Sequence, residues 1–84
     1  MKEITNDAWR LETYSADDGY MVDIQEVCCL DKDEYEAWLY HQDYGIKTLM
    51  FAMPVEQQSL EEFVEIVERN VDGHKALYND LYVR

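Results

Sequence analysis

Two histidines and two cysteines are the residues of this 84-residue chain that most readily support catalysis. A histidine acts as a base near neutral pH, and a cysteine thiolate acts as a nucleophile when a base lies beside it. His41 and His74 lie far apart in the sequence, so a paired role requires the fold to bring them together. Cys28 and Cys29 are adjacent in a predicted strand, where neighbouring side chains point to opposite faces, and this disfavours a disulfide between them. We therefore expect surface histidines, reduced cysteines that pack as small apolar groups, and no enzyme activity, with a Cys and His enzyme as the remotest alternative.

Metal and cofactor sites are not predicted either. Asp31, Asp33 and Glu34 resemble the start of a calcium-binding loop. The rest of that loop is missing, because Glu36 stands where glycine is required and Gln42 stands where a bidentate Glu is required. The three glycines are too far apart to form a phosphate-binding loop, and the adjacent cysteines lack the spacing of a zinc site. We expect no catalytic residue, no metal and no cofactor.

The charge of the chain limits its partners. It has 19 Asp and Glu against 7 Lys and Arg, which gives a net charge of -12. Approach to phosphate groups is repulsive at this charge, so direct binding to nucleic acid or to an anionic membrane is disfavoured and a basic protein partner is favoured. The first residues contain no apolar signal segment, and no window approaches the length of a membrane span, so the chain is predicted to be cytoplasmic. The alternative is that the acidic residues only keep the protein soluble.

Residues 59–72 form the clearest pattern, an amphipathic helix with an S-x-x-E capping box at its start and Gly73 as its predicted stop. One flank of the helix carries four acidic residues, Glu61, Glu65, Glu68 and Asp72, which we call the acidic ridge. No Lys or Arg lies among them. Glu68 and Asp72 are near the predicted C-terminal end, where the helix dipole disfavours an acid by about 0.3 to 1 kcal/mol. Because stability gives no reason for these two acids, the acidic ridge is a predicted partner-binding site.

The spacing of these charges suggests one kind of partner. The acidic ridge spans about 16 Å of helix at about 1.5 Å per residue, and with Glu62 it carries one charge per about 3.3 Å. One DNA strand carries a charge every 3.4 Å or so. Small acidic inhibitors of nucleases, such as phage anti-restriction or anti-CRISPR proteins, share this general character. The first hypothesis is a non-enzymatic interaction module that binds a basic protein surface, with nucleic-acid mimicry as one form of it.

The remaining sequence predicts an antiparallel sheet. Alternating apolar residues predict strands at 8–15, 20–30, 34–41 and 46–53. Asp17-Asp18-Gly19 predicts the first hairpin turn, and Gly45 a left-handed residue in the third. The alternation changes at Gln25 and Glu26, which predicts a β-bulge there or, as the alternative, a strand end covered on both faces.

The predicted elements form one α+β domain over residues 1–84. Residues 1–7 have no pattern and are predicted to be a loose arm, whereas residues 77–82 have helical spacing and are predicted to form a short second helix. The expected fold is a four-stranded antiparallel β-meander with one longer and one short C-terminal helix packed on one face.

A helix layer on one face leaves the other face of the sheet to be covered or to bind a partner. If Leu49 faces the helix, the alternation of the last strand places Met50 on the opposite face. The predicted partner-binding or dimer face consists of Trp38, Tyr40, Ile46 and Met50. The second hypothesis is therefore a structural or accessory subunit, or a homodimer, that uses this aromatic face and has no inhibitory role. The alternative is that the arm or a curled sheet covers the face.

Overall fold

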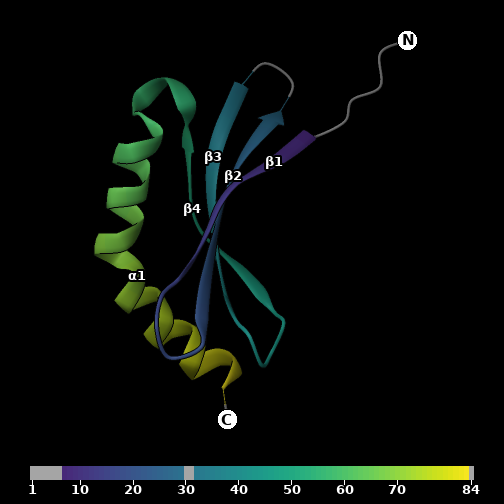
Figure 1. The fold of residues 1–84 in the computed structure, drawn as a ribbon, viewed down its shortest axis with the longest axis vertical. Coiled ribbons are helices and arrows are strands. Elements are labelled where there is room, and N and C mark those ends of the chain that lie inside the picture. Colours follow the sequence, from purple (N-terminus) through teal and green to yellow (C-terminus); the bar gives the residue numbers. More distant parts are fainter. Residues whose placement is uncertain (1–6, 30–31, 84) are drawn as a thin grey trace.

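The computed structural model describes residues 7–29 and 32–83. Four strands are present, β1 Asp7–Ser15, β2 Tyr20–Cys29, β3 Lys32–His41 and β4 Lys47–Pro54. A short 3-10 turn, Val55–Gln57, leads to one long helix, α1 Leu60–Tyr82. The strands form an antiparallel sheet in the order β1-β2-β3-β4, and α1 lies across one face of it (Figure 1). The predicted α+β class and four-stranded meander are confirmed, whereas the predicted arm lies outside the described residues apart from Asp7.

The long helix begins where the sequence predicts. The Ser59 hydroxyl accepts a hydrogen bond from the Glu62 backbone N–H at 3.1 Å, and the Glu62 carboxylate accepts one from the Ser59 backbone N–H at 3.0 Å. This capping box pairs two backbone donors that the first turn leaves without helical partners. Within the described residues no helix is long and apolar enough to cross a membrane.

The predicted stop at Gly73 and the separate short helix at 77–82 are wrong, because α1 continues through both. A glycine inside a helix costs only about 1 kcal/mol relative to alanine. The residues after Gly73 offset that cost by packing: Tyr78 is fully buried, and its hydroxyl donates a hydrogen bond of 2.6 Å to the Ile46 carbonyl. The only other helical segment in the described chain is the 3-10 turn before α1.

Two β-bulges set the direction of side chains in the sheet, and both lie in edge strands. The pairing of β2 with β3 is regular along its whole length, so the predicted bulge at Gln25 and Glu26 is wrong. The irregularity lies instead in β1, between Arg10 and Glu12. A bulge in an edge strand interrupts one ladder, whereas a bulge in β2 would interrupt two. Val27 keeps the opposite parity and is nevertheless buried, which agrees with the alternative of a strand end covered on both faces.

The second bulge reverses two predicted orientations in β4. Ala37 pairs with Phe51, and Trp38 pairs with Leu49, so Met50 is the extra residue between them. Directly paired residues share a face of the sheet, and Leu49 therefore lies on the face that α1 leaves uncovered, which we call the open face. Met50 is 8% exposed and belongs to the core. The predictions that Leu49 faces the helix and that Met50 lies on the exposed face are both wrong.

The core lies between the sheet and α1. Its fully buried side chains are Val22, Ile24, Ala37 and Leu39 from the sheet and Phe63 and Val67 from the helix, together with Tyr78. The two central strands thus supply one wall of the core and α1 the other. The outer flanks of α1 remain at the surface, and one of them carries the acidic ridge.

Candidate functional site

All four residues of the acidic ridge are exposed. Phe63 and Val67 anchor the opposite side of α1 in the core, so the helical period places the ridge on a flank that points away from the sheet. Asp72 reaches 95% side-chain exposure. The sequence predicted this exposure, and because α1 continues through all four positions, the helical period places them along one flank.

The acidic ridge faces the β1 side of the molecule, where Glu12 extends the acidic surface. Tyr14, on β1, packs against the core below this flank. Burial, followed by the negative charges of Glu68 and Glu12, raises the pKa of Tyr14 to about 12. The Tyr14 hydroxyl is buried and has no hydrogen-bond partner among the described residues. This junction could not be predicted from the sequence, because it depends on tertiary packing between α1 and an edge strand.

A basic residue that was not predicted from the sequence, Lys75, lies beside the ridge. The Lys75 ammonium donates a hydrogen bond of 2.6 Å to the Ala16 carbonyl and lies 3.8 Å from the Asp72 carboxylate. It lies 3.7 Å from the Asp18 carboxylate as well. No Lys or Arg lies among the ridge residues in the sequence, but Lys75 partly offsets the charge of Asp72. Lys75 becomes its i+3 neighbour only because the helix continues past Gly73.

The continuous helix also removes the predicted dipole penalty. Asp72 lies about three turns before the end of α1 at Tyr82, and Glu68 lies about four turns before it. The dipole effect is confined to the last turn. Repulsion between neighbouring carboxylates is therefore the main cost of the acidic ridge. A shallow hollow of about 330 Å³ lies beside Glu65, Glu68 and Arg69, so the surface near the ridge is concave.

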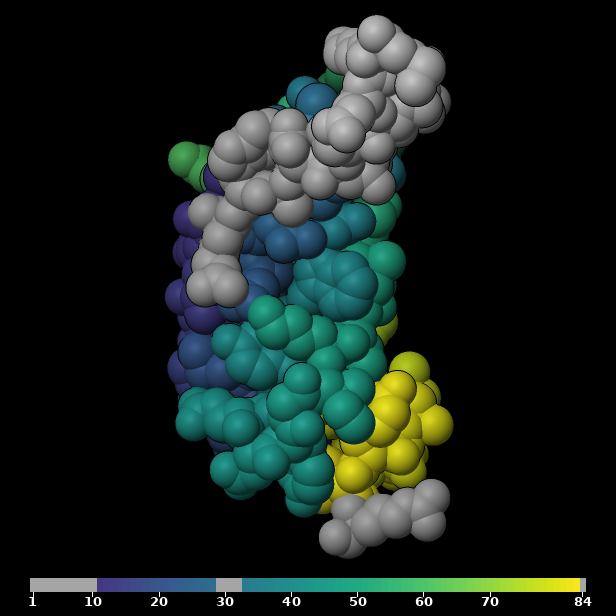
Figure 2. All heavy atoms as spheres, turned by 90° about the vertical axis from the view of Figure 1, so that its right-hand side faces the viewer, coloured from purple at the N-terminus to yellow at the C-terminus, as the bar shows by residue number. Residues whose placement is uncertain are grey.

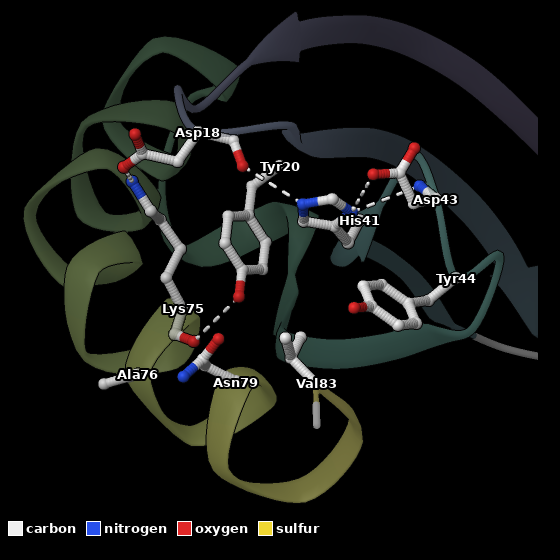
Figure 3. A pocket seen from close by; sticks show the side chains of 9 residues that line it. All are labelled: Asp18, Tyr20, His41, Asp43, Tyr44, Lys75, Ala76, Asn79 and Val83. Carbon is white, nitrogen blue, oxygen red and sulfur yellow. Dashed lines mark hydrogen bonds and ion pairs between the residues drawn. The ribbon is translucent and has the colours of Figure 1, made fainter.

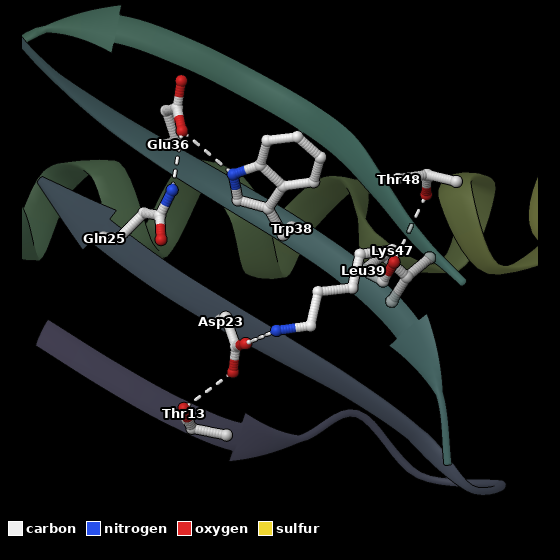
Figure 4. A network of polar contacts seen from close by, with 8 residues as sticks. All are labelled: Thr13, Asp23, Gln25, Glu36, Trp38, Leu39, Lys47 and Thr48. Carbon is white, nitrogen blue, oxygen red and sulfur yellow. Dashed lines mark hydrogen bonds and ion pairs between the residues drawn. The ribbon is translucent and has the colours of Figure 1, made fainter. Parts of the chain in front are cut away.

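The open face carries a second group of polar and aromatic side chains (Figure 4). The Trp38 indole N–H and the Gln25 amide both donate to one oxygen of Glu36, at 3.0 and 2.8 Å. The Lys47 ammonium lies 4.9 Å from the centre of the Tyr40 ring. Trp38 and Tyr40 are half-buried, so these two residues of the predicted aromatic face do lie at the surface of the sheet.

A buried acid, Asp23, lies beneath the side chains of this face and binds two of its neighbours. Asp23 is 3% exposed, and its carboxylate accepts hydrogen bonds from the Thr13 hydroxyl at 2.7 Å and from the Lys47 ammonium at 2.8 Å (Figure 4). A hollow of about 190 Å³ is lined by Asp23, Gln25, Trp38 and Lys47. Sequence alternation placed Asp23 on the polar side of its strand but gave no signal for its burial or for Lys47 as its partner. Ile46 precedes β4 and is exposed as predicted, whereas Met50 is buried, so the predicted aromatic face lacks one of its four residues.

The histidines have separate surroundings. The Asp43 backbone N–H donates to Nδ1 of His41 at 3.1 Å, so the neutral ring carries its proton on Nε2, which donates to the Asp18 carbonyl at 3.1 Å (Figure 3). His41 therefore ties two turns together at the edge of a cavity of about 470 Å³. His74 contacts the Phe51 ring instead, with 5.0 Å between ring centres.

Cys28 and His41 are not brought together as a nucleophile and base. Cys28 pairs with Asp33 near one end of the β2–β3 ladder, whereas His41 pairs with Tyr20 at the other end. Eight residues of strand separate these two positions, or about 26 Å. Among the described residues, no cluster of three or more His, Cys, Asp or Glu is arranged to hold a metal ion.

No protein-family model, curated protein or solved structure matches this chain. The arguments for its function therefore rest on its own residues. The acidic ridge, with four exposed carboxylates on one flank of α1, is the first candidate site, and the open face around Trp38 is the second.

Proposed function

We propose that this protein is a non-enzymatic interaction module of the cytoplasm, and that its acidic ridge binds a basic surface on a protein partner. The observation that supports this most directly is the set of contacts that the ridge does not make. Among the described residues, Glu61, Glu65 and Glu68 form no hydrogen bond or ion pair, and Asp72 has only the Lys75 ammonium at 3.8 Å. Three unpaired carboxylates on one helix flank repel one another, so a partner that supplies cations gains binding energy from charges that the fold leaves unused.

The surroundings of the ridge favour one extended partner surface. Glu12 on β1 adds charge at the side of the ridge, and the raised pKa of Tyr14 reflects both burial and the negative potential of Glu12 and Glu68. A neutral or acidic partner would meet repulsion or pay for desolvation there, whereas Lys and Arg side chains would be attracted from a distance. The finer proposal is nucleic-acid mimicry, since a rigid helix holds its carboxylates at a spacing near that of DNA phosphates.

The test compares two variants with the same change in charge. The ridge variant carries Glu61→Gln, Glu65→Gln and Glu68→Gln. The control variant neutralises three other exposed acids by Asp33→Asn, Glu56→Gln and Asp80→Asn. Asp33 and Glu56 lie outside α1, and Asp80 lies on a different flank of the helix. Immobilised wild type and both variants are used to capture DNA-binding proteins, and the captured proteins are eluted with increasing salt and, separately, with duplex DNA.

The proposal predicts that the ridge variant loses capture, that the control variant keeps it, and that salt releases the partner. Release by duplex DNA supports mimicry, and so does inhibition of DNA cleavage by a restriction endonuclease or by a guide-loaded CRISPR nuclease. Equal loss in both triple variants would show that only total charge matters and would refute a specific site. Capture that survives salt and DNA would also refute it.

The second candidate is an accessory subunit or homodimer that binds through Trp38 and Tyr40 on the open face. It is favoured by one observation, the hollow beside Trp38, whose ring is held by the Glu36 carboxylate at 3.0 Å. Trp38→Ala is expected to weaken such an association by more than about 1 kcal/mol while the fold survives. Unchanged association of this variant would eliminate the second candidate.

A further inference from the structure

The molecule has one apolar side, where the sheet ends at β4. Six large apolar side chains are exposed in the described chain, and four of them come from β4, from the residue before it and from the second half of α1. These four are Ile46, Leu49, Leu77 and Leu81, which we call the apolar edge; their exposed fractions lie between 43% and 55%. Leu49 also lies on the open face, paired with Trp38, so the apolar edge adjoins that face. The hydrogen bond from Tyr78 to the Ile46 carbonyl joins the two segments, and Figure 2 shows the yellow end of α1 beside the teal start of β4.

The apolar edge is also the part of the chain with the fewest acids. Residues 44–55 contain Lys47 as their only charged residue, and residues 73–83 contain only Lys75 and Asp80. The other edge strand, β1, has both a bulge and charged residues, Arg10 and Glu12 among them. Charges and bulges in edge strands prevent unwanted strand pairing. β4 has the same two forms of protection, the bulge at Met50 and a Lys at its start, but only that one charged residue.

We propose that the apolar edge is the interface of a homodimer, in which two copies meet through β4 and the second half of α1 about a twofold axis. Two chains of charge -12 repel each other over most of their surfaces, and this edge is where they approach with the fewest facing acids. A basic partner would find one carboxylate, Asp80, in residues 44–55 and 73–83 together. In a twofold dimer each apolar side chain meets an apolar side of the other copy, which removes an exposed patch from water.

The interface would have a defined limit along β4. The backbone carbonyls at the two ends of the strand already accept hydrogen bonds within the chain. The Tyr78 hydroxyl donates to the carbonyl of Ile46, just before β4, and the Gln58 amide donates to the Pro54 carbonyl at 2.8 Å. The bulge at Met50 interrupts a regular ladder between these ends. We therefore assign most of the association to apolar contacts of Leu49, Leu77 and Leu81. A standard interface of about 800 Å² per partner would use roughly a seventh of the 5822 Å² surface.

The test is sedimentation equilibrium of the full chain over a range of protein and salt concentrations. The wild type is expected to shift from 10.0 kDa towards twice that mass. Leu49→Glu and Leu81→Glu are each expected to raise the dimer dissociation constant about tenfold or more. Leu77→Lys is expected to do the same although its new charge is positive, which separates the loss of apolar contact from added repulsion. Leu11→Glu is the matched control, since Leu11 is equally exposed at the opposite edge of the sheet and should leave the dimer unchanged.

Salt distinguishes this interface from the acidic ridge. Added salt screens the repulsion between two acidic chains and should strengthen the dimer, whereas it should weaken capture of a basic partner. A wild type that stays monomeric at every concentration overturns the homodimer. A dimer that Leu49→Glu and Leu81→Glu leave intact, or that Leu11→Glu weakens equally, overturns its assignment to the apolar edge. Circular dichroism of each variant shows that the fold is retained.

Discussion

Replacement of Glu68 by Gln should stabilise the protein. Glu68 has an acidic neighbour three residues before it, Glu65, and another four residues after it, Asp72. Each like-charge pair at this spacing costs about 0.2 to 0.5 kcal/mol, so removal of one charge relieves about 0.4 to 1 kcal/mol. The lower value is favoured, because Lys75 already offsets part of the Asp72 charge. For a domain of this size the melting temperature should rise by about 2 to 8 °C.

The same substitution has a second readout at Tyr14. Its raised pKa means that Tyr14 keeps its proton longer in the folded state, so the stability it contributes is present below pH 10 and is lost as the pH rises from 10 to about 12. Glu68→Gln removes one cause, so the pKa of Tyr14 should fall in an alkaline absorbance titration. It should stay above 10, because burial is the larger cause.

Thermal melting of Glu68→Gln beside Glu56→Gln provides the comparison. Glu56 is an exposed acid on the 3-10 turn, and its neutralisation should change stability by less than about 0.5 kcal/mol. A lower melting temperature for Glu68→Gln would show that its carboxylate has a stabilising role in the fold. The inference that the ridge is kept for binding rather than for stability would then fail.

Three further substitutions test the fold by urea denaturation. Gly73→Ala should stabilise by about 0.5 to 1 kcal/mol, because Gly73 is inside α1 and a Cβ there meets no atom within 4 Å; a loss of stability would contradict the continuous helix. Gly19→Ala should destabilise by about 1 to 3 kcal/mol, because Gly19 has φ +85° and a Cβ would lie 2.6 Å from Nε2 of His41; an unchanged stability would refute this close approach. Lys47→Met should cost about 1 to 3 kcal/mol, because the buried Asp23 carboxylate loses a bond of 2.8 Å, and a neutral outcome would show that its other contacts suffice.

The strands and their turns were predictable because their signals are local. Alternation located all four strands to within two residues, and Asp17 and Asp18 do adopt the positive φ expected of the first turn. Gly45 also has the predicted positive φ. The bulges were not predictable, since the same change of parity can be absorbed in either of two paired strands. The length of α1 depended on the burial of Tyr78, which is a tertiary contact.

In the candidate sites, too, some features were predictable from the sequence and others depend on tertiary packing. The exposure of the acidic ridge follows from the helical period once Phe63 and Val67 are placed in the core. Glu12 comes from β1, and only tertiary packing brings its charge near Tyr14 together with that of Glu68, whereas Lys75 is a neighbour of Asp72 because α1 continues past Gly73. The aromatic face failed at Met50 because one extra residue in β4 reverses the direction of its side chain.

The most direct test of the acidic ridge is nuclear magnetic resonance mapping of the isotopically labelled chain with the captured basic partner. If the ridge binds, amide signals should shift along residues 61–72 and near Glu12 and Tyr14, and added salt should reverse the shifts. Shifts confined to the open face around Trp38, or to the apolar edge, and unaffected by salt, would contradict the account.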